Sequence, residues 1–245
     1  MIYITGDTHG DWMSRLRTNA FPEQKEMTKD DYVIVCGDFG IWHDTNQERY
    51  NLDWLEDKPF TTLFVDGNHE NFDRLYTMPI SEWHGGKVHF IRPSVIHLMR
   101  GQIFNIEDKT FWTFGGASSH DISDGILEID DPRVRKWRYD NEKMYRINHV
   151  SWWKEELPSE EEMEEGCKNL ENIDNRVDFI VTHCGATNSM VLYSHGEYKS
   201  DILTDYLEDI RQRVNFGRWF MGHYHTNYAI NDKEIILYEQ IVRIN

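Results

Sequence analysis

The residues most able to do chemistry follow five short apolar runs of the sequence. They form the clusters Gly6-Asp7-Thr8-His9, Gly37-Asp38, Gly67-Asn68-His69-Glu70, Thr182-His183 and Gly222-His223-Tyr224-His225. The candidate metal ligands in them are two carboxylates, one amide and four imidazoles, namely Asp7, Asp38, Asn68, His9, His183, His223 and His225. Seven ligands are too many for one ordinary ion. Two ions roughly 3.5–4 Å apart can share a carboxylate and clamp the attacking and leaving oxygens of phosphoryl transfer, so the set predicts a two-metal centre.

The donor types also bear on the metal and on the nucleophile. Nitrogen and oxygen donors without a set of thiolates favour Mn, Fe or Zn over Ca or Mg, and they do not choose among the three. Two divalent ions carry four positive charges, of which the two aspartates balance two. Because such a site attracts phosphate and lowers the pKa of a bound water towards neutrality, we expect a metal-bound hydroxide as the nucleophile.

His69 is the candidate general acid. It directly follows Asn68, so its imidazole lies at the rim of the centre if the amide binds a metal, where a leaving alkoxide needs a proton. Together with Asp38 and Asn68 it forms the predicted catalytic group. Glycines precede the polar residues in four of the clusters, and their freedom to turn tightly brings the strand ends close to metals and phosphate.

The five apolar runs are the elements that must position these residues. They are rich in β-branched and aromatic residues, and each is short enough for one buried strand: Ile2 to Thr5, Tyr32 to Cys36, Thr61 to Asp66, Val177 to Val181 and Arg218 to Met221. Ligands of open α/β sheets collect beyond the carboxyl ends of the strands. The clusters can therefore converge although they are spread over positions 6 to 225.

In type and order, the clusters resemble those of the calcineurin-like metallophosphoesterase superfamily. Its five motifs run Asp-x-His, Gly-Asp, Gly-Asn-His-Asp/Glu, His and Gly-His-x-His, and all five occur here in that order. The resemblance implies an α/β fold in which two mixed β-sheets pack as a sandwich flanked by helices, with the metal site at the C-terminal ends of the strands. It also implies one metal held by Asp7, His9, Asp38 and His225, and a second held by Asp38, Asn68, His183 and His223, with Asp38 as the bridge.

One position departs from the family pattern. The family often has an acid or an arginine three positions after the bridging aspartate, the acid orienting the catalytic histidine, but position 41 is Ile. The protein serine/threonine phosphatases of the superfamily carry Gly-Asp-x-Val-Asp-Arg-Gly at this place, so that class is disfavoured. Asp44, Glu70 and Asp73 are the alternatives for orienting His69, and the sequence does not decide among them.

The composition limits the partners and the compartment. A formal net charge of −17 over 245 residues argues against general affinity for nucleic acid or anionic membranes and favours a phosphorylated small-molecule or nucleotide substrate. Three scattered cysteines suggest reduced thiols, and neither an export signal nor a membrane span is recognisable, so we expect a cytoplasmic protein. No linker or low-complexity run interrupts the chain. We therefore expect one domain over residues 1–245, while the oligomeric state stays open.

The remaining sequence predicts hairpins and helices. Val95 to Arg100 and Gln102 to Ile106 are expected to form a hairpin at Gly101, followed by a strand from Lys109 to Phe114, all in the second sheet. Helices are expected at Gln47 to Glu56, at Glu160 to Ile173 behind the capping box Ser159-x-x-Glu162, and at Asp201 to Val214. A hairpin around Asn231-Asp232 and a strand from Ile241 to Ile244 are expected to close the chain.

Residues 117–158 lack such periodicity and are expected to form an irregular excursion. From Asp131 to Arg146 this segment has six basic residues against three acidic ones, opposite to the rest of the chain. Long irregular loops inside compact domains tend to be functional. We expect the segment to select the substrate through Arg133, Arg135 and Arg138, because a guanidinium group can bind two phosphate oxygens at once. A solvated face is the alternative.

Three functions follow from these residues. The leading hypothesis is a binuclear metal-dependent hydrolase of phosphoric esters, monoester or diester, without a covalent intermediate. The enzymatic alternative is a nuclease or cyclic-nucleotide phosphodiesterase, with residues 117–158 as the recognition element. The third is a metal-binding interaction module that has lost turnover, against which the intact ligands and His69 argue.

Overall fold

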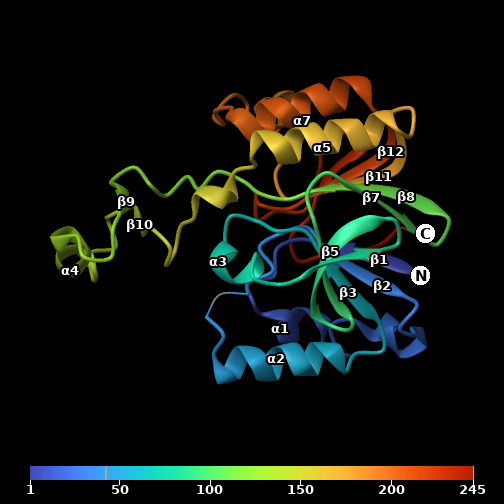
Figure 1. Cartoon of the computed structure of the whole chain (residues 1–245), viewed down its shortest axis with the longest axis horizontal. Helices are drawn as coiled ribbons and strands as arrows, with labels where there is room; N and C mark the ends of the chain where they lie inside the picture. Colours follow the sequence, from blue (N-terminus) through green and yellow to red (C-terminus); the bar gives the residue numbers. More distant parts are fainter. Residues whose placement is uncertain (42, 245) are drawn as a thin grey trace.

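Two mixed β-sheets form the centre of the computed structural model, which describes residues 1–41 and 43–244 (Figure 1). The first sheet has seven strands, in the spatial order β15 (Ile241–Arg243), β1 (Ile2–Thr5), β2 (Tyr32–Val35), β3 (Thr61–Phe64), β6 (Val95–Leu98), β5 (Gly86–Arg92) and β4 (Ile80–Trp83). Strands β1, β2, β3 and β6 are parallel neighbours. The pairs at both edges are antiparallel.

The second sheet has six strands and the same mixed character. Their spatial order is β13 (Tyr228–Ala229), β14 (Glu234–Ile236), β12 (Asn215–Met221), β11 (Arg176–Thr182), β8 (Lys109–Phe114) and β7 (Gln102–Ile106). Strands β14, β12, β11 and β8 are parallel neighbours, whereas β13 and β7 pair antiparallel at the edges.

Helices cover the outer face of each sheet. Figure 1 shows α1 (Trp12–Leu16) and α2 (Asn46–Glu56) on the side of the first sheet, and α5 (Glu160–Glu171) and α7 (Ile202–Arg213) on the side of the second. The shorter helical segments are η1 (Pro22–Glu26), α3 (Phe72–Leu75), α4 (Pro132–Trp137), η2 (Lys154–Glu156) and α6 (Thr187–Tyr193). The α5 helix begins with the expected capping box, in which Ser159 and Glu162 bond each other's backbone.

The apolar core lies in three layers that follow this order of helices and sheets. Ile4, Leu63 and Phe111 belong to the buried cluster between the two sheets. Leu55 of α2 packs on the outer face of the first sheet, and Leu207 of α7 packs on the outer face of the second. Because the central strands are covered on both faces, their sequences are continuous apolar runs and do not alternate with polar residues. The predicted sandwich of two mixed sheets flanked by helices is confirmed.

The prediction of a hairpin at Gly101, with both of its strands in the second sheet, is wrong. Strand β6 pairs with β3 and β5 of the first sheet, whereas β7 pairs with β8 of the second. Gly101 lies where the chain crosses between the sheets, with a φ of +71°, and a Cβ there would collide with the backbone of Gly166 on α5. Two apolar runs flanking a glycine predict a turn, but the partners of each run are set by contacts far away in the sequence.

Residues 117–158 are less irregular than expected. They contain α4, η2 and a small sheet in which β9 (Gly125–Leu127) pairs in parallel with β10 (Tyr145–Ile147). Figure 1 shows α4 at the far end of this segment, away from both large sheets. Most of its side chains are exposed or half-buried, so the alternation of buried and exposed positions that reveals a strand or helix is weak here.

Among the described residues, no helix is long and apolar enough to cross a membrane. The cytoplasmic location and the single domain over residues 1–245 stay predictions.

Candidate metal centre

The five polar clusters meet at one end of the two sheets, directly after the carboxyl ends of β1, β2, β3, β11 and β12. Asp7, His9, Asp38 and His225 each place one possible ligand atom within 4.8 Å of those of the other three. The Nε2 atoms of His9 and His225 face each other at 3.0 Å, and His225 Nε2 lies 3.2 Å from Asp7 Oδ2. This is the first of the two ligand sets that the family resemblance implies.

The second set lies on the other side of Asp38. His183 Nε2 is 3.3 Å from Asp38 Oδ1 and 3.3 Å from Asn68 Oδ1. The imidazole of His223 packs against that of His183, with ring centroids 5.0 Å apart. Asp38 has one carboxylate oxygen near His9 and the other near His183, so its side chain lies between the two sets.

Hydrogen bonds outside the two sets fix the orientation of the ligand atoms. His183 Nδ1 donates to the carbonyl oxygen of Cys36 at 2.8 Å, which turns Nε2 towards Asp38. The Asn68 amide nitrogen donates to Ser119 Oγ, which turns its oxygen towards His183. Ser119 is itself held by the buried carboxylate of Glu156. Such partners of metal ligands set the tautomer and the ring orientation.

The backbone at the centre is strained where it presents ligands. The residues with left-handed φ angles include four of the predicted ligands, His9 at +47°, Asp38 at +44°, His223 at +68° and His225 at +46°. This conformation is uncommon outside glycine and persists when the surrounding structure enforces it, chiefly at functional sites. At Asp38 the next turn is held by Glu70, which accepts hydrogen bonds from the backbone N–H groups of residues 39–41.

Two glycines are required by close contact with the carboxylates. A Cβ at Gly67 would collide with the Asp38 carboxylate, and a Cβ at Gly222 would collide with that of Asp7. The same Asp7 carboxylate accepts the backbone N–H of His223 at 2.9 Å. The glycines therefore let neighbouring strand ends approach the acidic side chains directly.

One buried acid and one buried imidazole at the centre, Asp38 and His183, stabilise each other's charged form. Burial alone would raise the pKa of Asp38, but His183 outweighs it and holds that pKa well below its usual range. Burial likewise opposes the charged form of His183, yet the Asp38 and Asp7 carboxylates raise its pKa to about 10. Burial lowers the pKa of His9 and, further still, that of His223.

His69 lies at the rim of the centre, as expected. Its backbone N–H donates to Asp38 Oδ1 at 2.8 Å, and its ring lies 5.5 Å from that of His9. Burial lowers its pKa against the pull of the Asp38 carboxylate. Its Nε2 atom is 3.5 Å from a guanidinium nitrogen of Arg146, a residue of the 117–158 segment.

The three acids considered for orienting His69 all bind other groups. Glu70 holds the backbone after Asp38. Asp44 pairs with Arg49, and Asp73 accepts hydrogen bonds from His149 and from the Trp153 indole. The side chain of Ile41 is itself buried in the core cluster on the outer face of the first sheet.

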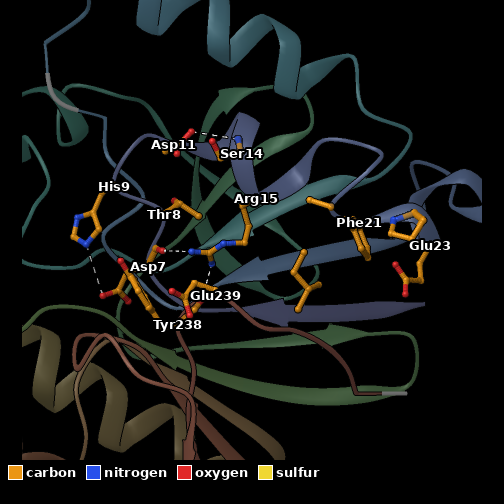
Figure 2. A pocket seen from close by; sticks show the side chains of 13 residues that line it. Asp7, Thr8, His9, Asp11, Ser14, Arg15, Phe21, Glu23, Tyr238 and Glu239 are labelled. Carbon is orange, nitrogen blue, oxygen red and sulfur yellow. Dashed lines mark hydrogen bonds and ion pairs between the residues drawn. The ribbon is translucent and has the colours of Figure 1, made fainter.

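Three hollows adjoin the centre. The largest, about 640 Å³, begins at Asp7 and His9 and extends past Arg15 to Tyr238 and Glu239 (Figure 2). A second of about 590 Å³ begins at His223 and His120, and a third of about 210 Å³ lies at His69 and Arg146. A substrate bound at the metal ligands can thus extend in more than one direction.

The predicted substrate-binding arginines do not join the metal ligands. Arg133 and Arg135 lie on α4 and Arg138 directly follows it, at the far end of the 117–158 segment (Figure 1). Arg133 pairs with Asp131, two residues before it. Their role in substrate binding stays a prediction.

Sequence reasoning missed the residues through which the 117–158 segment reaches the centre. These are Ser119, Asp121, Arg146 and Glu156. It also missed Arg15 of α1, which donates to the carbonyl oxygens of Asp7 and Tyr238 and braces the backbone at the first ligand (Figure 2). Arg146 was visible only as one of six basic residues, and the polar residues Ser119 and Glu156 carry no motif.

Comparisons with known proteins agree with the motif pattern. The sequence model of the calcineurin-like phosphoesterases matches residues 1–227. The chain is 21% identical over 256 residues to a lariat debranching enzyme of Danio rerio, covering 93% of this chain and 40% of that protein. It is 20% identical over 266 residues to that of Drosophila pseudoobscura pseudoobscura, covering 93% and 43%. The chain thus spans about two fifths of the length of these relatives.

Among solved structures, the chain resembles the crystal structure of phosphopantetheinyl hydrolase from Mycobacterium tuberculosis. The TM-score is 0.45 at 16% sequence identity, over 97% of this chain and 87% of that one.

Proposed function

The chain belongs to the calcineurin-like phosphoesterase family, and on that premise we propose that it hydrolyses a phosphoric ester with two bound divalent ions and with His69 as general acid. The family makes it a metal-binding hydrolase, as the motifs predicted. The number and identity of the ions, the roles of single residues and the substrate are the proposal.

The residues present fit two metal ions. Asp7, His9, Asp38 and His225 would hold one, and Asp38, Asn68, His183 and His223 would hold the other. In support, His225 Nε2 lies 3.0 Å from His9 Nε2 and 3.2 Å from Asp7 Oδ2. In the other set, His183 Nε2 lies 3.3 Å from Asp38 Oδ1 and 3.3 Å from Asn68 Oδ1. The mixture of imidazole nitrogens with carboxylate and amide oxygens suits Mn, Fe or Zn.

Bound ions would supply positive charge for the phosphate and lower the pKa of a water molecule that attacks it. The remaining step, protonation of the leaving oxygen, is assigned to a residue of the chain. The oxygen of a water molecule forms a new bond to phosphorus and gives up its proton to the solvent. The bond from phosphorus to the ester oxygen breaks, and His69 gives that oxygen a proton, so that an alcohol leaves.

The observation that carries this proposal is the position of Asp38. Its carboxylate is buried between His9 and His183 and accepts the backbone N–H of His69. A Cβ at Gly67 would collide with this carboxylate. One acid thereby connects both predicted ion sites and the predicted general acid.

A phosphodiester is the second candidate substrate. It has a group on each side of the phosphorus, and hollows of about 640 Å³ and 590 Å³ adjoin the two predicted ligand sets. The relatives named lariat debranching enzymes make a nucleotide-containing diester a reasonable choice for testing. The net charge of −17 still argues against general binding of nucleic acid.

The test is a hydrolysis assay of the purified chain with Mn²⁺. A 4-nitrophenyl phosphate monoester and a bis(4-nitrophenyl) diester are supplied in parallel, with the chelator-treated protein as the control. Release of nitrophenol that depends on Mn²⁺ supports the proposal, and the faster ester indicates the substrate class. If neither ester is cleaved with Mn²⁺, Fe²⁺ or Zn²⁺ bound, the alternative of a metal-binding module without turnover is favoured.

A further inference from the structure

A hollow of about 210 Å³ lies beside His69, and none of the seven predicted metal ligands lines it. It is lined by His43, His69, Arg146, Val150, Ser151 and Trp153. Four of these six residues belong to the 117–158 segment. The segment therefore supplies most of the residues that line this hollow, although its outer end, at α4, lies away from both large sheets (Figure 1).

Arg146 is the charged group of this hollow, and it is firmly held. Its Nε atom donates to Asp121 Oδ1 at 2.9 Å and its Nη2 atom lies 2.6 Å from Asp121 Oδ2. The same Nη2 atom is 3.5 Å from His69 Nε2. A guanidinium has five N–H donors in a rigid plane, and the pair with Asp121 engages two of them. The ion pair with Asp121 fixes the plane of the guanidinium group and leaves further N–H groups of Arg146 for an anion.

The hollow also has apolar lining residues, Val150 and Trp153. Trp153 is only 4% exposed and belongs to the core cluster on the outer face of the first sheet. Its indole N–H donates to Asp73 of α3 at 2.7 Å. Val150 lies three positions earlier in the chain and is exposed. A group that enters the hollow thus meets both a cation and apolar side chains.

The chemistry of the general acid decides which part of a substrate enters the hollow. His69 gives its proton to the oxygen that leaves phosphorus, so that oxygen lies next to the imidazole. The rest of the leaving group is attached to this oxygen and extends from the imidazole away from the metal ligands. The hollow around Arg146 adjoins this imidazole and is lined by none of the predicted metal ligands.

We propose that this hollow binds the leaving group of the ester, and that Arg146 selects leaving groups that carry an anionic oxygen group of their own. The proposal rests on the proposed function, since it needs His69 to act on the leaving oxygen. Charge-assisted hydrogen bonds from a guanidinium favour carboxylate and phosphate oxygens. The apolar side chains of Trp153 and Val150 favour a flat or apolar part between the ester oxygen and the anion.

Two esters of equal size test the charge preference. They are the monophosphates of 3-carboxy-4-nitrophenol and of 3-carbamoyl-4-nitrophenol, which place a carboxylate or an uncharged amide at the same position of the leaving group. The kcat/KM values of the Mn²⁺-loaded full chain are measured for both. Hydrogen bonds to charged groups have a net effect that corresponds to about a tenfold preference or more for the carboxylate ester.

In Arg146→Gln, the preference for the carboxylate ester is expected to fall close to one, and Arg146→Lys is expected to retain part of it. Arg218→Gln is the matched control, because Arg218 is an exposed arginine on β12 outside this hollow, and it is expected to keep the full preference. The ratio of two kcat/KM values does not depend on the fraction of folded enzyme. A partly unfolded variant therefore still reports the preference.

Two results would overturn the inference while leaving the proposed function intact. One is a parent enzyme that cleaves both esters without preference. The other is an equal fall for both esters in Arg146→Gln, which would mean that Arg146 serves the phosphate being cleaved or the fold. If the parent cleaves neither of these monoesters nor the bis(4-nitrophenyl) diester, the proposed function itself fails. If it cleaves only the diester, the same comparison is made with the methyl diesters of the same two phenols.

Discussion

The metal centre and the α4 end of the 117–158 segment both concentrate charged side chains, but the fold holds them in different ways. Asp38 is buried, and its partners His69 and His183 are 31 and 145 positions away in the sequence. Arg133 is half-exposed, and its partner Asp131 is two positions away. A substitution in the centre therefore disturbs contacts among several strands, whereas one on α4 changes a local contact only.

The largest expected effect is that of Asp38→Asn. Asp38 adjoins both predicted ion sites, so the loss of its charge should weaken both together. Substituting a residue that only hydrogen-bonds to a metal ligand typically lowers the metal affinity about 10–100-fold. Substituting a ligand that two ions share should lower it more. Metal analysis after equilibration with Mn²⁺ is expected to give close to two ions per chain in the parent protein and fewer than one in the variant.

The matched variant is His9→Ala, which removes a ligand from the first set alone. It should lower the content towards one ion per chain and spare the site of His183. Equal and independent losses in the two variants would contradict the assignment of Asp38 as a bridge.

The next largest effect is expected on turnover in His69→Ala. His69 adjoins the ligands without belonging to either set, so the variant should keep its metal content. Loss of general acid catalysis corresponds to a fall of about 10²–10⁴-fold in kcat. The fall should shrink for esters with a good leaving group, because an easily expelled phenolate needs little protonation. His195→Ala, at an exposed position, is the control, and an equal fall for all leaving groups would assign His69 another role.

A smaller effect is expected from a change of pH on the affinity of the centre for Mn²⁺. The acids around His183 raise its pKa to about 10, so at neutral pH the ion must displace a proton from this imidazole. Apparent affinity at that site should therefore rise with pH, by up to about tenfold per unit between pH 6 and 8 for one displaced proton. Calorimetric titration in buffers of different ionisation enthalpy measures both the affinity and the proton release. An affinity that is constant over this range would contradict the coupling.

The centre was predictable from sequence because its residues depend on a simple rule. Each candidate ligand directly follows a continuous apolar run, and parallel strands bring their carboxyl ends to one edge. Asp7 and His225 therefore meet although 218 positions separate them. Four of the candidate ligands lie within 4.8 Å of one another, and the other three contact Asp38 or His183. The family itself is confirmed, and the role of each ligand stays a prediction.

The rest could not be predicted because it depends on pairing between distant segments. The runs on either side of Gly101 look like a hairpin, yet they pair with different sheets. Arg146 and Arg133 are equivalent as members of a basic stretch. The difference between them arises because β10 pairs in parallel with β9, with Arg146 opposite Ile126, and so returns the chain to His69. No local pattern carries that information.

The smallest effect is expected from neutralising Arg133, Arg135 and Arg138 one at a time. These arginines lie at α4, away from the two large sheets, so they can contact only a substrate that is long enough to reach them. Exposed ion pairs contribute at most about 1 kcal/mol, which corresponds to a change of about fivefold in kcat/KM. At least one of the variants should show such a fall within a panel of nucleotide mono- and diesters, while turnover of 4-nitrophenyl phosphate stays nearly unchanged. If all three variants match the parent on every compound, or change only the oligomeric state, α4 is a solvated or subunit-contacting face, and substrate selection by the 117–158 segment is confined to its end near His69.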